Sequence, residues 1–364
     1  LGTNEDFANV CSNLHKEGIR VVLDGVFNHV GRGFWAFQDV LKNRENSAYV
    51  NWFARIDFNG NSNYNDGLWY EGWEGCYDLV KLNLYNEDVI QHIFKAIKGW
   101  VNEFDIDGLR LDVAYCLNHD FLRRLRSFCD SLKPDFFLLG ETLHGDYNQI
   151  MNEEMLHSVT NYECYKGLYS SFNCMNMFEI NHSLLRQFGP ENWTLYKGKH
   201  LLSFVDNHDV TRVASILNNA NHLPLIYTLA FGMPGIPCVY YGSEWGATGR
   251  KEDGDPALRV SFDTPIWNDL TTFISKLAVA KKSSNALNYG SFSSIVLTNE
   301  QCIFLRQYND ERVLVAINTS EQPYFASFNI GTDTCTDLIS GSEIKLNNGM
   351  ELPGYSSFIL QPFS

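Results

Sequence analysis

Two acidic residues stand at the ends of apolar runs that have the length of buried strands. Asp112 lies at the end of the run 108–113, and Glu141 follows the run 136–139. Hydrolysis of a glycosidic bond with retention needs a carboxylate nucleophile and a carboxylic acid about 5–5.5 Å apart. Two strand-end acids on neighbouring strands satisfy this requirement. The pattern therefore predicts that Asp112 and Glu141 form such a pair.

Further polar residues follow the other apolar runs. They are Asp24 after the run 19–23, Asn207, His208 and Asp209 after the run 201–205, and Gly242 to Glu244 after the run 236–241. Arg110 lies two residues before Asp112, so it points to the same side of its strand and can keep that aspartate ionised. Polar groups at the carboxyl ends of parallel barrel strands converge on one face, where barrel enzymes keep their catalytic residues.

Helices alternate with these runs. A capping-box pattern at Thr3 and Asp6 begins the first helix, which Gly18 ends, and the segment 121–132 has the periodicity of a later helix. A weaker strand pattern lies near 158–162. Alternation of strand and helix predicts a parallel sheet, and over this length it predicts a (β/α)8 TIM barrel.

One connection is longer than a routine loop of such a barrel. The segment 31–77 is rich in Asn, Gly, Trp and Tyr, and its length predicts a small inserted subdomain. Its aromatic residues Trp69, Tyr70 and Trp73 are candidates either for sugar-stacking platforms or for the subdomain's own core.

The periodicity changes to alternation near the carboxyl end of the chain. Six short strands are expected there, at 294–297, 302–307, 312–318, 324–329, 343–346 and 356–360. They predict an antiparallel β-sandwich domain over 288–364, which leaves 1–287 for the catalytic barrel.

Four motifs, in this order along the chain, resemble those of the α-amylase superfamily of glycoside hydrolases: D-G-V-F-N-H at 24–29, G-L-R-L-D at 108–112, G-E-T at 140–142 and F-V-D-N-H-D at 204–209. The segment K-L-N at 81–83 is similar to an element of the neopullulanase, cyclomaltodextrinase and maltogenic amylase branch. The segment 235–246 resembles the last barrel strand of the superfamily. The resemblance covers essentially the whole chain.

This resemblance implies roles for individual residues. Asp112 is the expected nucleophile, Glu141 the acid/base, and Asp209 the residue that binds the sugar 2- and 3-hydroxyls. The residues expected to line the subsite of the sugar under attack are Asp24, His29, Arg110 and His208. Asp24 alone also fits a strand-end cap, and Arg110 with Asp112 alone also fits a structural ion pair.

The implied activity is cleavage of α-1,4-glucosidic bonds, with α-1,6 bonds left open, through a covalent glycosyl-aspartate intermediate. The substrates would be maltodextrins, cyclodextrins or related oligosaccharides. Two alternatives stay open: a transglycosylase, glucosyltransferase or isomerase of the same superfamily, and a non-catalytic member that serves assembly or transport.

The sequence also departs from the family pattern. It opens with the helix that precedes the third barrel strand in the family, so the first two βα units are expected to be missing and the insertion to follow the third strand. The residues 113–116, Val-Ala-Tyr-Cys, replace a lysine-histidine or asparagine-glutamate ending. Asn28 matches a calcium-binding position of many α-amylases, but the branch indicated by Lys81 often lacks that ion. We therefore expect no required cofactor and predict no metal ligand, although a structural calcium ion stays open.

Composition narrows the partners and the compartment. A formal net charge of −15 at pH 7 would repel nucleic acid, and the sequence contains no run of 18 apolar residues that could span a membrane. The nine cysteines are scattered and show no zinc-site spacing, which favours a reducing, cytoplasmic location. An incomplete barrel would expose sheet edges, so a homo-oligomer stays open.

Overall fold

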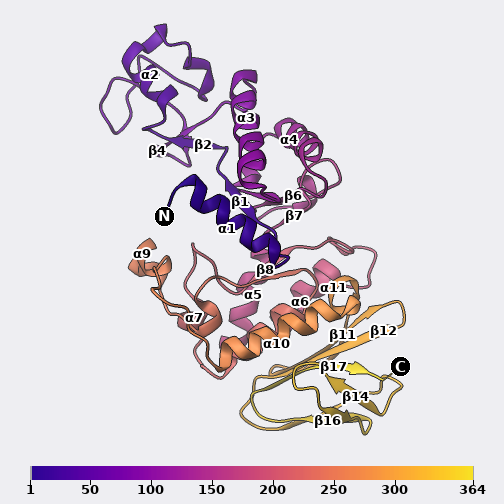
Figure 1. Cartoon of the computed structure of the whole chain (residues 1–364). Helices are drawn as coiled ribbons and strands as arrows, with labels where there is room; N and C mark the ends of the chain where they lie inside the picture. Colours follow the sequence, from indigo (N-terminus) through magenta and orange to yellow (C-terminus); the bar gives the residue numbers. More distant parts are fainter. Residues whose placement is uncertain (1, 364) are drawn as a thin grey trace. The chain divides into compact units, whose positions relative to one another are not determined.

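The computed structural model describes residues 2–363. The chain divides into two compact units, with the boundary between Val159 and Thr160, and each unit is described by itself (Figure 1). Helices and strands alternate in both units, as the sequence predicts. None of the helices in residues 2–363 has the length and apolar character needed to cross a membrane.

The first unit is built on a parallel sheet whose strands follow one another in chain order, β1-β5-β6-β7. Its strands are β1 (Val22–Gly25), β5 (Gly108–Leu111), β6 (Phe137–Gly140) and β7 (Ser158–Val159). Its helices are α1 (Asn4–Lys16), α3 (Glu87–Phe104) and α4 (His119–Leu132). This arrangement is the one that a (β/α) barrel requires.

The first helix begins as predicted. Thr3 is its N-cap: Thr3 Oγ1 accepts a hydrogen bond from the backbone N–H of Asp6, and the Asp6 carboxylate accepts one from the backbone N–H of Thr3. The prediction of a buried strand at 19–23 was wrong in its bounds and burial. The strand lies at Val22–Gly25, and Ile19 is 51% exposed. β1 is the edge strand of this four-stranded sheet, and its first residue, Val22, is 40% exposed as well.

A small subdomain follows β1. It contains a three-stranded antiparallel sheet in the order β2-β4-β3, one α-helix and two short 3-10 helices, with bounds β2 (His29–Gly31), α2 (Trp35–Asn43), β3 (Gly72–Trp73) and β4 (Cys76–Lys81). Pairing of His29 with Lys81 closes its base, so the subdomain extends beyond the predicted 31–77. Tyr70 is fully buried and its ring contacts Phe37 at 4.9 Å between centroids. Tyr70 therefore belongs to the core of the subdomain.

The second unit continues the strand and helix pattern. Strand β8 (Leu202–Phe204) pairs in parallel with β9 (Ile236–Cys238), and Thr160 forms a parallel bridge with Leu202. The longer helices are α5 (Tyr162–Asn173), α6 (Met177–Phe188), α8 (His222–Gly232) and α10 (Asp269–Ser283), and the shorter ones are α7 (Val213–Ile216), α9 (Asp255–Leu258) and α11 (Asn285–Tyr289).

The carboxyl-terminal strands form an antiparallel domain in the second unit. The larger sheet has the order β10-β11-β12-β17-β14-β15, with bounds β10 (Ser291–Leu297), β11 (Gln301–Tyr308), β12 (Glu311–Asn318), β17 (Ser356–Pro362), β14 (Thr334–Asp337) and β15 (Glu343–Lys345). A second sheet pairs β13 (Tyr324–Ser327) with β16 (Gly349–Leu352). Apolar side chains of both sheets share one core, which includes Leu314, Leu360, Ala326 and Leu352.

The prediction of six strands in this domain was wrong by two. Strands β14 and β16 were missed because β14, Thr-Cys-Thr-Asp, has one apolar side chain and β16 begins with a glycine. Gly349 has φ of 142°, and a Cβ there would lie 2.1 Å from the carbonyl oxygen of Ala326. This position of β16 therefore requires glycine.

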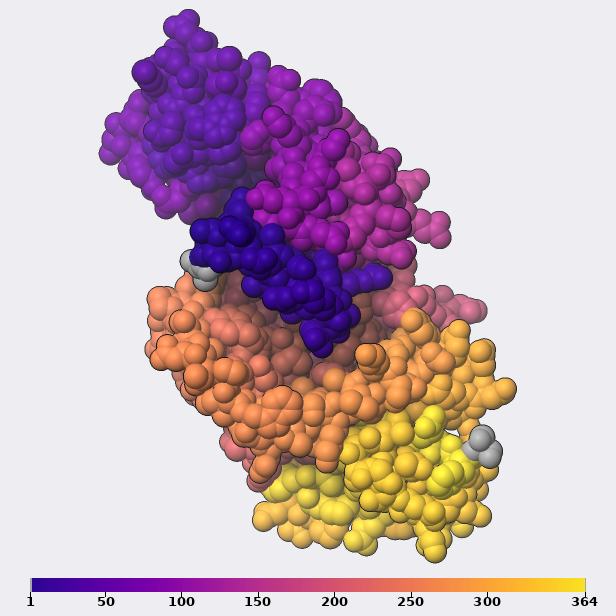
Figure 2. All heavy atoms as spheres, viewed as in Figure 1, coloured from indigo at the N-terminus to yellow at the C-terminus, as the bar shows by residue number. Residues whose placement is uncertain are grey.

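Helix α8 joins the antiparallel domain to the helices of the second unit. It is apolar on all sides and contacts both β12 and β17. The buried guanidinium of Arg306, on β11, donates a hydrogen bond of 2.8 Å to the carbonyl oxygen of Gly232, the last residue of α8. In Figure 2 the orange surface of α10 and the yellow surface of the strands are continuous.

Candidate active site

Arg110 binds three carboxylates at the carboxyl ends of three adjacent strands. Its Nη1 lies 2.8 Å from Asp24 Oδ1 and 2.9 Å from Asp112 Oδ1. Its Nη2 lies 2.7 Å from Glu141 Oε1. The parallel register brings these side chains together. Asp24 of β1 pairs with Arg110 of β5, and Leu111 of β5 pairs with Gly140 of β6.

The charges around Arg110 determine its ionisation. Burial lowers the pKa of Arg110, but the three carboxylates, Glu141 foremost, outweigh burial and raise that pKa above its ordinary value. Arg110 is therefore a permanent cation. The structure places it where the sequence predicts, on the same side of its strand as Asp112.

Glu141 is the most enclosed carboxylate of this group. Its side chain is 8% exposed, against 23% for Asp112 and 54% for Asp24. Its Oε2 accepts a hydrogen bond of 3.0 Å from the backbone N–H of Val113. Its backbone carbonyl oxygen accepts another, of 2.9 Å, from the N–H of Ala114. The turn that follows Asp112 therefore holds Glu141 at two points.

This turn contains an unusual backbone conformation. Val113 has φ of 42° and ψ of 46°, in the left-handed region, and its side chain is buried. For a β-branched residue this region is an outlier that costs about 1–3 kcal/mol. The strained residue is thus the one whose N–H donates to the Glu141 carboxylate.

His29 lies beside Asp112. Its Nε2 is 4.0 Å from Asp112 Oδ2, and the ring centroids of His29 and Trp73 are 5.7 Å apart. The Asn28 side-chain nitrogen lies 3.2 Å from His29 Nδ1. Burial lowers the pKa of His29, and the charge of Asp112 opposes this effect only in part. At neutral pH the ring is uncharged and can bind a hydroxyl group.

The second unit carries Asp209 and His208 after β8. Asp209 Oδ2 lies 3.1 Å from His208 Nε2, and Asp209 Oδ1 lies 2.8 Å from Arg259 Nη2. Hydrogen bonding to His208 lowers the pKa of Asp209 to about 2, with Arg259 adding to this effect and burial opposing it. Asp209 is therefore ionised over the range in which proteins usually work.

Arg259 is not among the site residues that were predicted from the sequence. It is the C-cap residue of the short helix α9 and has no periodic pattern around it. Its contact with Asp209 becomes visible only in the fold.

The loop between β8 and Asp209 is anchored by a buried acid. Asp206 Oδ2 accepts hydrogen bonds of 2.7 Å from Ser243 Oγ and 2.8 Å from the N–H of Val213. Burial raises the pKa of Asp206 to about 6, although these hydrogen bonds lower it. Asp206 Oδ1 and Glu244 Oε2 are buried without a hydrogen-bond partner in residues 2–363.

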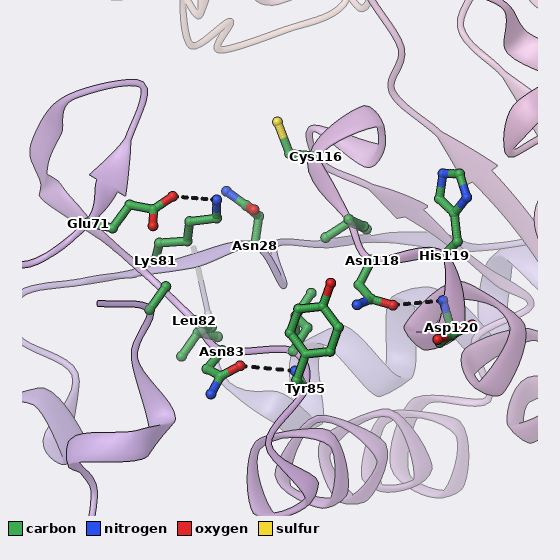
Figure 3. Close-up of a pocket in the computed structure, with 13 residues that line it drawn as sticks. Asn28, Glu71, Lys81, Leu82, Asn83, Tyr85, Cys116, Asn118, His119 and Asp120 are labelled. Carbon is green, nitrogen blue, oxygen red and sulfur yellow. Dashed lines mark hydrogen bonds and ion pairs between the residues drawn. The ribbon is translucent and has the colours of Figure 1, made fainter. Parts of the chain in front are cut away.

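The surroundings of Asn28 do not fit a calcium ion. The Lys81 ammonium, 2.7 Å from Glu71 Oε1, lines the same pocket as Asn28 and Cys116 (Figure 3). Calcium takes six to eight oxygen ligands, and a resident cation opposes a second one. Among residues 2–363, no cluster of three or more His, Cys, Asp or Glu side chains could hold a metal.

Two family models match the chain. Residues 1–289 match the family model of the α-amylase catalytic domain, and residues 296–359 match that of the maltogenic amylase C-terminal domain. The chain is 28% identical to a cyclomaltodextrinase of Thermoanaerobacter pseudethanolicus, covering 99% of this chain and 63% of that protein. It is 30% identical to a maltogenic α-amylase of Bacillus acidopullulyticus, covering 97% of this chain and 61% of that protein.

A solved structure agrees as well. The cyclic α-maltosyl-(1→6)-maltose hydrolase of Arthrobacter globiformis, in complex with its substrate, matches with a TM-score of 0.83 and 27% identity over 99% of this chain and 79% of that one. The chain spans about three-fifths of the length of the two curated relatives. The resemblance seen in the sequence is thereby confirmed, and the chain belongs to the α-amylase family of glycoside hydrolases, with a maltogenic-amylase type of C-terminal domain.

Proposed function

We propose that the protein hydrolyses α-1,4-glucosidic bonds of maltodextrins and cyclodextrins with retention of configuration. The observation that carries this proposal is the contact of one guanidinium, that of Arg110, with both Asp112 and Glu141. Two carboxylates bound to the two nitrogens of one fork are close enough to flank a single bond, as a retaining pair must. The names of the relatives support the substrate class.

In the first step Asp112 attacks the anomeric carbon and forms a glycosyl ester. Glu141 donates its proton to the leaving oxygen, so the second sugar departs as an alcohol. In the geometry described above Glu141 is ion-paired with Arg110. Protonation of Glu141 requires this pair to loosen, and we place that change at substrate binding.

In the second step water attacks the anomeric carbon of the ester. Glu141, now ionised, accepts a proton from the water, the bond to Asp112 breaks, and the product leaves with its original configuration. The proton balance closes, because Glu141 ends the cycle protonated as it began. Asp24, Arg110 and the uncharged His29 are proposed to bind hydroxyl groups of the sugar under attack.

Asp209 and His208 are proposed to bind the 2- and 3-hydroxyls of a glucosyl unit, as the family resemblance implies. The low pKa of Asp209 keeps it an acceptor for two hydroxyl protons. Hydrogen bonds that shorten as the ring flattens would stabilise the transition state more than the bound substrate.

We propose that this chemistry needs no metal ion and takes place in the cytoplasm. The ammonium of Lys81 beside Asn28 supports the first point. All nine cysteines are free thiols, which supports a reducing compartment. A relative from Bacillus subtilis, 29% identical over 79% of this chain and 48% of its own length, is named an intracellular maltogenic amylase.

The test is an assay on maltotriose and β-cyclodextrin with proton NMR of the first products. We expect one new reducing end for each bond cleaved, with the α-anomer appearing first. The Asp112→Asn and Glu141→Gln variants should lose at least about a thousandfold in kcat. A β-anomeric first product, longer or rearranged saccharides without net hydrolysis, or parental rates in both variants would overturn the proposal. Transglycosylation and a non-catalytic role are not favoured, because the matched relatives carry the names of hydrolases.

A further inference from the structure

The pocket that contains Asn28, Lys81 and Cys116 is a cavity of the first unit. It has a volume of about 540 Å³ and is lined by residues of the inserted subdomain, of the segment 82–85 and of the turn that leads into α4. Figure 3 shows these side chains arranged around the pocket, with Lys81 and Asn28 on one side and Asn118 and His119 on the other. None of the roles proposed above uses this cavity.

Tyr85 is the aromatic residue of the pocket, and it is unusually accessible. Its side chain lies on the surface, with 84% of the residue exposed. Its backbone is fixed: the N–H of Tyr85 donates to Asn83 Oδ1 at 3.1 Å, and the next residue, Asn86, caps α3. In Figure 3 the ring stands between Asn83 and Asn118 with its hydroxyl end directed toward the pocket. A backbone position held by a hydrogen bond therefore presents an exposed aromatic ring.

The polar groups around this ring have unused hydrogen-bonding capacity. Asn118 Oδ1 accepts from the N–H groups of Asp120 and Phe121, while no hydrogen bond of its side-chain nitrogen occurs within residues 2–363. Asn28 is 2% exposed, and its Nδ2 contacts His29, which leaves its Oδ1 without a partner in the same range. Lys81 Nζ has Glu71 as its acceptor. The wall thus offers both donors and acceptors.

The charges of the wall select the class of ligand. Lys81 and Glu71 compensate each other at 2.7 Å, and the carboxylate of Asp120 is paired with Arg123 at the same distance. Neither a metal cation nor a strong anion finds an uncompensated opposite charge. A neutral molecule with many hydroxyl groups and one flat apolar face matches the donors, the acceptors and the ring.

We propose that this pocket is an accessory oligosaccharide site, which binds glucosyl units of a chain away from the bond that is cleaved. The proposal rests on the proposed function for its sugar chemistry. Two contacts link the pocket to the catalytic carboxylates. The first is the contact between the Asn28 side chain and His29 Nδ1; the other ring nitrogen of His29 lies near Asp112. The second is the turn 113–116, in which the N–H of Cys116 binds the carbonyl oxygen of Val113 and the N–H of Ala114 binds that of Glu141. A saccharide held here would help to retain long substrates.

The test compares the parent with Tyr85→Ala and Tyr85→Phe. Kinetics are measured on maltotriose and on a maltodextrin of about ten glucose units. For Tyr85→Ala we expect the ratio of the KM for the long chain to the KM for maltotriose to rise about two- to tenfold, the range of one aromatic contact. Tyr85→Phe keeps the ring face and should restore most of the parental ratio. As a matched control, Phe325→Ala removes an aromatic residue of β13 that is 55% exposed and lies outside this pocket.

Direct binding separates this proposal from the proposed function. The long maltodextrin is titrated calorimetrically into the Asp112→Asn variant with and without Tyr85→Ala. Loss of one class of binding sites in the double variant supports the accessory site. This holds even if the parent hydrolyses nothing, because absence of hydrolysis would overturn only the proposed function. Identical isotherms and an unchanged KM ratio in an active enzyme would overturn the accessory site and leave the proposed function standing. Equal losses in Tyr85→Phe and Tyr85→Ala would also overturn it, because stacking would then not be the cause.

Discussion

The backbone N–H of Val113 donates a hydrogen bond of 3.0 Å to Glu141 Oε2. Val113 directly follows the candidate nucleophile, so one left-handed residue connects the nucleophile strand to the candidate acid/base. Strain of this kind persists only where the surrounding structure enforces it, and it gathers at functional sites. The connection makes the shape of the turn, and not only the identity of its side chains, part of the catalytic arrangement.

Replacing Val113 with proline should impair catalysis far more than replacing it with glycine. Proline removes the N–H and forces φ to about −65°, whereas glycine keeps the donor and adopts positive φ without strain. We expect kcat to fall at least about a hundredfold in Val113→Pro, the cost of one catalytic hydrogen-bond donor, and at most about tenfold in Val113→Gly. Steady-state kinetics, with circular dichroism to verify folding, measure this. Parental kcat in a folded Val113→Pro variant would contradict the assigned role.

Removing the shared cation should disable the site without unfolding the chain. In Arg110→Met the three carboxylates lose their common partner, and we expect kcat to fall by about two to four orders of magnitude. Arg110→Lys should recover only part of the lost kcat, because an ammonium group cannot bind two carboxylates through two separate nitrogens. The control is Arg124→Met, which breaks the exposed pair with Glu87. Similar kcat values in the two methionine variants would contradict the role of Arg110.

Asp206 should make the stability of the protein fall as the pH rises. The folded state raises the pKa of Asp206 from 3.8 to about 6, so between these values it keeps a proton that the unfolded chain has lost. The free energy of unfolding therefore decreases as the pH rises from about 4 to about 6, by roughly 2–3 kcal/mol from this group, and levels off above that. Urea unfolding at several pH values measures the slope.

An Asp206→Asn variant tests the assignment of this slope. Its amide cannot ionise, and it removes the charge that is repelled by Glu244. We expect a smaller decrease in stability from pH 4 to 6 and a higher stability than the parent at pH 7. The exposed Asp310 supplies the control, Asp310→Asn, which should keep the parental slope. If both variants keep that slope, Asp206 is not its source.

Chelation should leave the enzyme unchanged. Because Lys81 and Glu71 already form a compensated pair beside Asn28, we expect the same Tm and the same kcat before and after treatment with EDTA. Differential scanning fluorimetry and a maltotriose assay measure both. A fall in Tm that added calcium chloride reverses would show that the site holds a metal after all.

The parallel strands made most of the candidate site predictable from sequence. Side chains at the carboxyl ends of adjacent strands must meet, and Asp24, Arg110, Asp112 and Glu141 do meet as the pattern indicates. The strand bounds were less predictable. The run 19–23 looks buried in sequence, but an edge strand has no neighbour on one side, and periodicity does not show which strand is at the edge.

Residues in irregular segments could not be predicted. Arg259 reaches Asp209 from a loop whose path depends on tertiary packing, and no local pattern distinguishes it from any other surface arginine. The left-handed conformation of Val113 was equally invisible, because valine disfavours it. Neither position carries a periodic or compositional signal, so only the assembled fold could reveal them.

The apolar helix α8 sets a limit on how the chain can be shortened. Its sides contact β12 and β17, its end is held by Arg306, and a Cβ on Gly232 would lie 2.7 Å from the side chain of Val315. Deletion of the strands after α11 would expose apolar side chains of this helix to solvent and remove the hydrogen bond from Arg306 at its carboxyl end. The antiparallel domain thus shields this helix from solvent. A minimal catalytic fragment must therefore retain the domain.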